Sequence, residues 1–435
     1  MPQGIKSLIV LCLLAAAGVA QAGLPIEQWE TKKGAQVLFV ESRGLPMVQF
    51  QLVFDAGSAR DVGRQAGIAK LTNQMLKQGA GGLDADDIAT RFGDVGAQFS
   101  VDSQRDMATL SLRSLSDTSA LDPAVDLLAK ILASPSFSEK SLQRERVRAL
   151  TRLELERQSP SEIAQRRFYE RLFAGHPYQQ YPSGDARGLK AIGRKDLVDY
   201  HRQYYVAANA VIAIIGDISQ RQAKDIAERL VGGLPKGQAA PPIPPVPMRK
   251  SASREYIAFP SKQSHIFMGQ PGIKRKDPDY FPLYVGNYTL GGGGLVSRLS
   301  EEVREKKGLA YSVYSYFLPM RALGPFTVGL QTKNSQIDKA LAIVNRVIKE
   351  FVETGPSAEE LDAAKKNLSG GFPLRIDSNQ KIAEYLALIG FYGLPLSYLD
   401  DFVAKVEAVT VEQVRDAYRR RVHPERMLTV IVGGK

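Results

Sequence analysis

Three features are scarce in this chain of 435 residues, and each scarcity excludes a kind of chemistry. The single cysteine, Cys12, leaves no disulfide framework and no set of thiolate ligands. There are only four histidines, His176, His201, His265 and His423, and none is near enough to another for a local ligand pair. A catalytic zinc ion usually takes three protein ligands. A GxSxG elbow, a phosphate-binding loop and a cysteine nucleophile are also missing.

Long hydrophobic runs are scarce as well, and the one near the N-terminus has the parts of a secretory signal peptide. Lys6 precedes an apolar run over 8–17, and Ala20-Gln21-Ala22 forms a small-x-small cleavage site. A retained membrane anchor is the alternative, but the run is too short to span a bilayer. We therefore expect a signal peptide over 1–22 and an exported, cysteine-free mature chain of 413 residues (435 less 22), with the bacterial periplasm the best-fitting compartment.

The net charge of +11 raises the possibility of a nucleic-acid partner. Export argues against that partner, and the arginines are spread through predicted helices instead of forming one basic run. A charged, solvated surface is the favoured interpretation, without nucleic acid and without an integral membrane segment in the mature chain.

The most informative stretch covers 289–316, TLGGGGLVSRLSEEVREKKGLAYSVYSY. Its four glycines predict a loop, because glycine permits a positive φ and close backbone approach; they are Gly291, Gly292, Gly293 and Gly294. Leu295, Leu299 and Val303 recur every four residues, which indicates an amphipathic helix that ends at Gly308. The alternating small and aromatic residues that follow predict a strand.

Arg304 falls in the last turn of this predicted helix, and Tyr311 lies seven residues further on. A guanidinium and a phenol on either side of a tight turn can grip a peptide carbonyl or a carboxylate. The alternative is a surface helix that runs into a core strand, with no binding role.

The run SRLSEEVREKKGLAYSVYS resembles the C-terminal-domain signature of the insulinase/pitrilysin/mitochondrial-processing-peptidase metallopeptidases, and the match continues over nearly the whole mature chain. In that family, an Arg and a Tyr at this spacing bind the substrate backbone. The resemblance implies that role for Arg304 and Tyr311, with the glycine loop bordering the substrate chamber. A simple turn into the helix remains the alternative for the loop.

The rest of the chain suggests an internal duplication joined by a linker. The proline-rich stretch PKGQAAPPIPPVPMRK predicts domains over 23–235 and 251–435, with the linker over 236–250. Similar strands, AVIAIIGD and MLTVIVGG, close the two halves. Strands and helices mix without regular βαβ alternation, which favours an α+β class. The family resemblance implies two similar α+β domains, each a sheet backed by helices, that close like a clamshell.

Individual elements follow from periodicity and capping. Strands are expected over 36–41, 47–54, 97–101, 108–112, 210–215, 265–269, 326–331 and 427–434, and helices over 67–78, from Asp84, over 121–133, 138–157, 196–204, 335–353 and 357–367, and after Pro160 and Asp377.

Catalytic members of the family carry H-x-x-E-H on a helix, where two His one turn apart bind zinc and the Glu takes a proton from water. The matching stretch here is GIAKLTNQML. It places Lys70 and Gln74 at the His positions and Asn73 at the Glu position, while the third ligand's position falls near Arg152. This chain is therefore expected to bind no metal of its own.

These observations predict a non-catalytic partner subunit of an exported, heterodimeric zinc metallopeptidase. A homologous subunit would carry the zinc, and this chain would contribute to the site for a peptide or unfolded protein. The alternative is a peptide-binding or scaffold protein of the envelope with no proteolytic complex. A third possibility, an autonomous zinc metalloendopeptidase, conflicts with the missing ligands.

Overall fold

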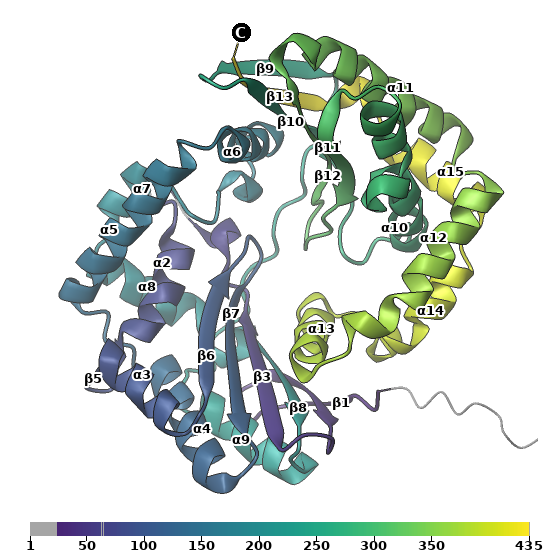
Figure 1. The fold of residues 1–435 in the computed structure, drawn as a ribbon. Helices are drawn as coiled ribbons and strands as arrows, with labels where there is room; N and C mark the ends of the chain where they lie inside the picture. The colour runs from purple at the N-terminus through teal and green to yellow at the C-terminus, as the bar shows by residue number, and fades with distance from the viewer. Residues whose placement is uncertain (1–23, 62, 64, 435) are drawn as a thin grey trace, which may run out of the picture.

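The computed structural model describes residues 24–61, 63 and 65–434, so the expected signal peptide over 1–22 lies outside the described residues. Two β-sheets, each with its own set of helices, lie one above the other in the view of Figure 1. Among the described helices, none is both long and apolar enough to cross a membrane.

The first sheet has six strands in the order β1-β2-β8-β3-β7-β6. They are β1 (Glu27–Glu30), β2 (Gln36–Glu41), β3 (Met47–Phe54), β6 (Gln98–Ser103), β7 (Ala108–Leu115) and β8 (Ala210–Gly216). The pair β2 and β8 is parallel and the other pairs are antiparallel. Every residue of β8 is buried, because helices cover both faces of the sheet at its centre.

The second sheet has five strands in the order β11-β12-β10-β13-β9. They are β9 (Ser253–Ala258), β10 (Gln263–Pro271), β11 (Ala310–Phe317), β12 (Pro325–Lys333) and β13 (Leu428–Gly433). Only β13 and β9 run parallel. Taken from β9 to β11, this sheet has the same strand order and directions as β2-β8-β3-β7-β6 in the first sheet. This repeat confirms the predicted duplication. The strands β6 and β11 are equivalent, and each lies at a sheet edge.

The first half also contains a pair of two-residue strands, β4 (Gly79–Ala80) and β5 (Leu83–Asp84). Its described residues form eight α-helices: α2 (Ile68–Met75), α3 (Ala85–Asp94), α4 (Thr118–Ala133), α5 (Glu139–Glu156), α6 (Pro160–Leu172), α7 (Ala186–Ala191), α8 (Arg194–Tyr204) and α9 (Gln220–Gly232). Asp84 caps α3 as predicted, with its carboxylate accepting from the backbone N–H groups of Asp86 and Asp87. Ser138 likewise caps α5.

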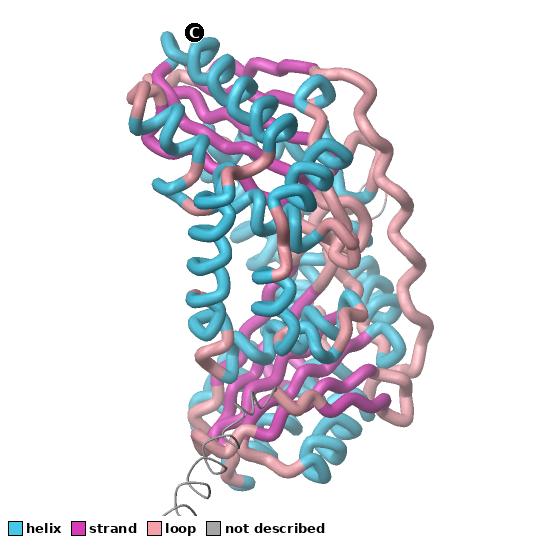
Figure 2. Tube along the Cα trace, turned by 90° about the vertical axis from the view of Figure 1, so that its right-hand side faces the viewer, coloured by secondary structure: helices cyan, strands magenta, loops and turns pink. Residues whose placement is uncertain are grey.

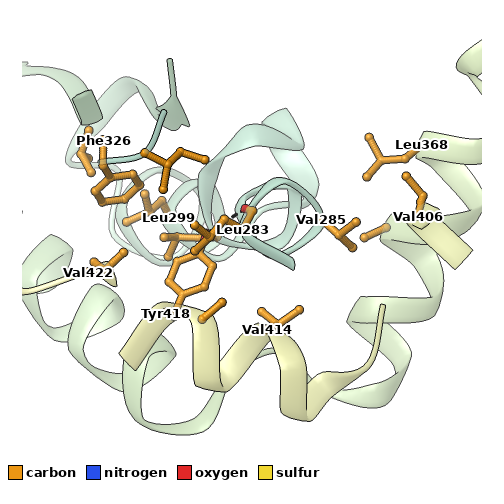
Figure 3. Packing of buried hydrophobic residues seen from close by; sticks show 14 of the residues in the cluster. Leu283, Val285, Leu299, Phe326, Leu368, Val406, Val414, Tyr418 and Val422 are labelled. Carbon is orange, nitrogen blue, oxygen red and sulfur yellow. Dashed lines mark hydrogen bonds between the residues drawn. The ribbon is translucent and has the colours of Figure 1, made fainter. Parts of the chain in front are cut away.

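The helices of the second half are α10 (Tyr280–Asn287), α11 (Ile337–Thr354), α12 (Ala358–Gly370), α13 (Asn379–Tyr392), α14 (Asp400–Glu407) and α15 (Val411–Arg421). Figure 3 shows α15 packing Val414 and Tyr418 toward Leu283 and Val285 of α10, with Leu299 in the same cluster. Leu299 is fully buried there, so this core anchors the segment that carries Arg304.

Two helices are exchanged between the halves, a feature that periodicity does not predict. The first half's α6 packs on β10 and β13 of the second sheet, while α13 of the second half packs on β3 and β8 of the first (Figure 1). Along β2, Leu38 and Val40 belong to the core that contains α13, whereas Val37 and Phe39 face the first half's own helices. Each sheet therefore needs a helix from the other half to cover its inner face.

Within the described residues, no helix or strand forms between α9 and β9, as expected for the proline-rich stretch. This stretch lies in the long loop that joins the two sheets in Figure 2. His176 fixes it from the first half, because the His176 Nε2 lies 2.9 Å from the carbonyl oxygen of Pro244 and donates to it. The expected boundaries at 235 and 251 stay a prediction, since the exchanged helices make the two halves interdependent.

Candidate functional site

The structure brings Arg304 and Tyr311 together at the N-terminal end of β11. The guanidinium carbon of Arg304 lies 5.6 Å from the ring centre of Tyr311, within cation–π range. Tyr311 is the extra residue of a β-bulge, because Ala310 pairs with Thr332 and Ser312 with its neighbour Gln331. Bulges re-aim side chains, and the Tyr311 side chain is 79% exposed. The substrate-binding role of the pair stays a prediction.

The predicted amphipathic helix is shorter than expected and wound differently. Leu295 lies in a separate 3-10 turn, Gly294–Val296, and is exposed, so its place in the helix was wrong. The backbone of Ser297 is extended, and its hydroxyl donates to the Gly294 carbonyl at 2.7 Å, which interrupts the helix before Leu299. Helical structure then continues with π-type hydrogen bonds over Ser300–Glu305.

The glycine run is not a loop throughout, which corrects the expectation for its first half. Gly291 and Gly292 end the helical segment Tyr288–Gly292, which continues α10. A Cβ on Gly291 would lie 2.7 Å from the backbone nitrogen of Ser315 in β11, so close packing explains this glycine. Gly293 follows as a turn, and Gly294 alone among the four has a positive φ, 63°.

Three cavities follow one another and share lining residues; the first two are lined from both halves, and the third is lined by the first half alone. The central cavity, about 660 Å³, is bordered by β6 and α13 and includes Asp102 and Tyr392. The middle cavity, about 410 Å³, shares Arg105, Pro182 and Leu318 with it. The basic cavity, about 360 Å³, shares Lys70 and Ser183 with the middle one. The lining of all three excludes Arg304, Tyr311 and the four glycines.

The basic cavity contains three of the four positions aligned with the metal site. Lys70 and Gln74 of α2 line it together with Arg152 of α5. This placement agrees with Arg152 as the match to the third ligand. Asn73 points the other way: it is fully buried, and its side-chain amide donates to the carbonyl oxygens of Asp102 at 2.6 Å and Thr109 at 3.3 Å.

The cavity is electropositive. Burial, and next the positive charge of Arg152, lower the pKa of Lys70. The carboxylate in its lining, Glu145, pairs with Arg148 at 2.7 Å. A lysine, a glutamine and an arginine do not provide the donors that zinc requires. Nor do the described residues contain any group of three or more His, Cys, Asp or Glu that could hold a metal ion.

The position of α2 depends on its first turn. Gly67 begins the helix with a φ of 99°. The Asp61 carboxylate then accepts from the backbone N–H of Gly67 at 2.6 Å and of Ala69 at 3.0 Å. Burial raises the pKa of Asp61 to about 7. The buried pair of Asp55 and Arg60, 2.7 Å apart, lies in the segment just before Asp61.

Arg105 is a site residue that the sequence did not indicate. Its guanidinium lies 3.6 Å from the ring centre of Tyr169, and its Nε donates to the carbonyl oxygen of Tyr178 at 3.2 Å. One terminal nitrogen is buried without a hydrogen-bond partner among the described residues. Arg105 sits in a strand-to-strand turn with no motif, and only the fold places it between two cavities.

The four histidines do not converge on a site. His176 caps a short 3-10 turn, where its Nδ1 accepts from the N–H of Tyr178 at 3.1 Å. His201 lies 3.0 Å from the carbonyl oxygen of Leu132, and burial lowers its pKa to about 4.

Known proteins share this architecture over nearly the whole chain. A crystal structure described as a peptidase M16 inactive domain, from Pseudomonas fluorescens, superposes with a TM-score of 0.91 at 41% identity, covering 95% of this chain and 99% of that one. Family profiles match residues 36–183, as insulinase (peptidase family M16), and 191–368, as the peptidase M16 inactive domain. The chain belongs to the M16 peptidase family.

Among curated M16 relatives, a protein named "Non-peptidase homolog YmxG" from Helicobacter pylori is 28% identical over 99% of both chains. Another, named "Uncharacterized zinc protease SCO5738" from Streptomyces coelicolor, is 27% identical over 91% of this chain and 87% of its own. The expected family and the α+β clamshell are thus confirmed, and the chain is an inactive M16 homologue.

Proposed function

We propose that this chain is the non-catalytic subunit of an exported heterodimeric M16 peptidase, whose homologous partner carries the zinc. It acts in the periplasm, after removal of residues 1–22, on peptides or unfolded segments. Arg304 and Tyr311 hold the substrate backbone, and the glycine segment 291–294 borders the chamber. The observation that carries the proposal is the basic cavity, where Lys70, Gln74 and Arg152 stand together.

The preserved parts of the fold support a role in substrate binding. The edge strand β6 borders the central cavity, and an exposed strand edge offers backbone groups for an extended peptide. In the second sheet, the edge strand β11 contains both Tyr311 and Tyr316, and Tyr316 lines the middle cavity with Lys70. Five steps along the strand separate these tyrosines by about 17 Å. One extended peptide is long enough to contact both.

A peptide-binding protein of the envelope with no proteolytic partner is the second candidate, because the cavities would bind peptides without any second chain. A homologue with an intact H-x-x-E-H motif that co-purifies from the native envelope favours the heterodimer. Its absence from every preparation favours the second candidate.

The test combines the purified chain with such a homologue and measures cleavage of a quenched fluorescent peptide. We expect no hydrolysis by this chain alone, and chelator-sensitive hydrolysis by the mixture. Hydrolysis by this chain alone, abolished by a chelator, would contradict the proposal.

Within an active mixture, Arg304→Ala and Tyr311→Phe should each lower the rate while the two chains stay associated on size-exclusion chromatography. Arg91→Ala, at an exposed position on α3, is the matched control and should leave the rate unchanged. Unchanged rates for both site variants would remove the substrate-gripping role.

A further inference from the structure

Lys70 stands where two of the cavities meet, and its charge is not neutralised locally. Within the described residues, the Lys70 ammonium has neither an ion pair nor a hydrogen bond. Asp102 and Glu156 are the carboxylates near enough to act on it electrostatically. Glu156 is already held by Arg166 at 2.7 Å, and Asp102 lies across on β6. The ammonium therefore faces open cavity.

Arg152 adds a second positive charge to the same cavity. Its guanidinium also has no ion pair within the described residues, and it is near enough to Lys70 to disfavour the lysine's charged form. A nearby like charge disfavours the charged form of the half-buried Lys70, and a bound anion would offset this repulsion. The other cation of the lining, Arg148, is matched by Glu145. The charges of Lys70 and Arg152 are thus available to bind an anionic group of a ligand.

The route into this cavity suits a peptide. The basic, middle and central cavities follow one another through shared lining residues, and the last is bordered by the edge strand β6. A chain paired with β6 would lie in the central cavity and extend past Arg105 toward Lys70. Arginine and lysine bind carboxylates through charge-assisted hydrogen bonds, which are stronger than neutral ones.

We infer that the position aligned with the family's metal site has become a carboxylate pocket, in which Lys70 and Arg152 bind an acidic group of a peptide that lies along β6. This inference rests on the proposed peptide-binding function and adds to it the class of substrate. The carboxylate is either an acidic side chain or the C-terminus of the peptide. Gln74 supplies a neutral amide to the same pocket.

The test uses three labelled peptides of otherwise identical, neutral sequence and measures binding to the purified chain by fluorescence polarisation. The first has a free C-terminus, the second has one glutamate and an amidated C-terminus, and the third has neither carboxylate. We expect at least one of the first two to bind about tenfold more tightly than the third, as befits a charge-assisted hydrogen bond. Comparison of the first two identifies the source of the carboxylate.

Lys70→Met and Arg152→Gln should each remove this preference, whereas Lys339→Met should retain it, because Lys339 is exposed on α11. Arg152 is exposed, so its variant tests the pocket even if Lys70→Met folds poorly. Relief of the repulsion predicts that Lys70→Met has an unchanged or raised melting temperature.

Equal affinity for all three peptides would overturn the carboxylate pocket and leave the proposed function standing. Absence of binding to any peptide would overturn the pocket as well, and the rate measurements on the mixed subunits would decide the proposed function separately. A preference that survives both cavity variants would place the carboxylate elsewhere.

Discussion

At the residue scale, Asn73 shows how a position of the metal site has taken a structural role. It aligns with the glutamate that takes a proton from water in catalytic relatives, but here its amide joins α2 to the backbone of β6 and β7. The neighbouring Lys70 and Gln74 face the basic cavity instead. One helix therefore presents a structural residue on one side and a charged pocket on the other.

We expect Asn73→Ala to lower the free energy of unfolding by about 1–3 kcal/mol, because the substitution removes a fully buried amide that donates to the carbonyl oxygens of Asp102 and Thr109. Gln74→Ala is the matched control on the same helix and should change it by less than about 0.5 kcal/mol. Denaturant unfolding of the two variants measures the difference. Equal effects would contradict the structural role of Asn73.

His201 provides a pH-dependent prediction at the same scale. Burial lowers its pKa from 6.5 to about 4, so the folded chain keeps it neutral where the unfolded chain binds a proton. Its stabilising contribution is complete above the unfolded pKa and is lost as the pH falls from about 6.5 toward 4. Relative to His201→Gln, the free energy of unfolding should fall by about 3 kcal/mol over that window. Parallel pH profiles would show that His201 is not buried as a neutral base.

At the scale of elements, sequence patterns located most strands and helices well. The strands over 36–41 and 47–54 have the predicted bounds, because each is a short, mostly apolar run that is buried over most of its length. The helix predicted around Leu295 was wrong, because apolar spacing alone does not reveal that Gly294 and Ser297 interrupt it. The resemblance located positions 70, 73, 74 and 152, but only the fold could show which of them share a cavity.

The exchanged helix α13 packs closely on the first sheet at one glycine, Gly390. A Cβ on Gly390 would lie 2.5 Å from Val211 Cγ1 and 2.7 Å from Leu38 Cδ1 of the first sheet. Gly390→Ala should therefore destabilise the fold by about 1–3 kcal/mol through overpacking.

Gly370→Ala, near the end of α12, is the control for this substitution, because its Cβ would meet nothing within 4 Å. It should be neutral or slightly stabilising, since alanine is the better helix former. Thermal unfolding compares the two, and equal melting temperatures would refute the close approach of α13 to the sheet.

At the scale of the whole molecule, the two halves form one structure through exchanged helices and a buried polar cluster. Asp106 accepts hydrogen bonds from Tyr178 at 2.7 Å, from Tyr392 at 2.9 Å and from the backbone N–H of Arg321 at 2.7 Å. Duplication was visible in the sequence because the closing strands are alike. The exchange was not, since an apolar helix face does not specify which sheet it covers.

We expect fragments 23–235 and 251–435 to be insoluble or partly folded when expressed separately, because each loses the helix that covers the inner face of its sheet. Co-expression should yield a complex that elutes like the intact chain on size-exclusion chromatography. Two separate fragments that each unfold cooperatively would show that the exchange is dispensable.

The chain's inability to hold a catalytic metal ion is the property on which its proposed role depends most. The purified chain can be equilibrated with zinc, desalted and analysed for metal content by mass spectrometry, beside a homologue with an intact H-x-x-E-H motif. We predict stoichiometric zinc in the homologue and only traces in this chain. Stoichiometric zinc in this chain, lost on substitution of Gln74 or Glu145 in the basic cavity, would contradict the account.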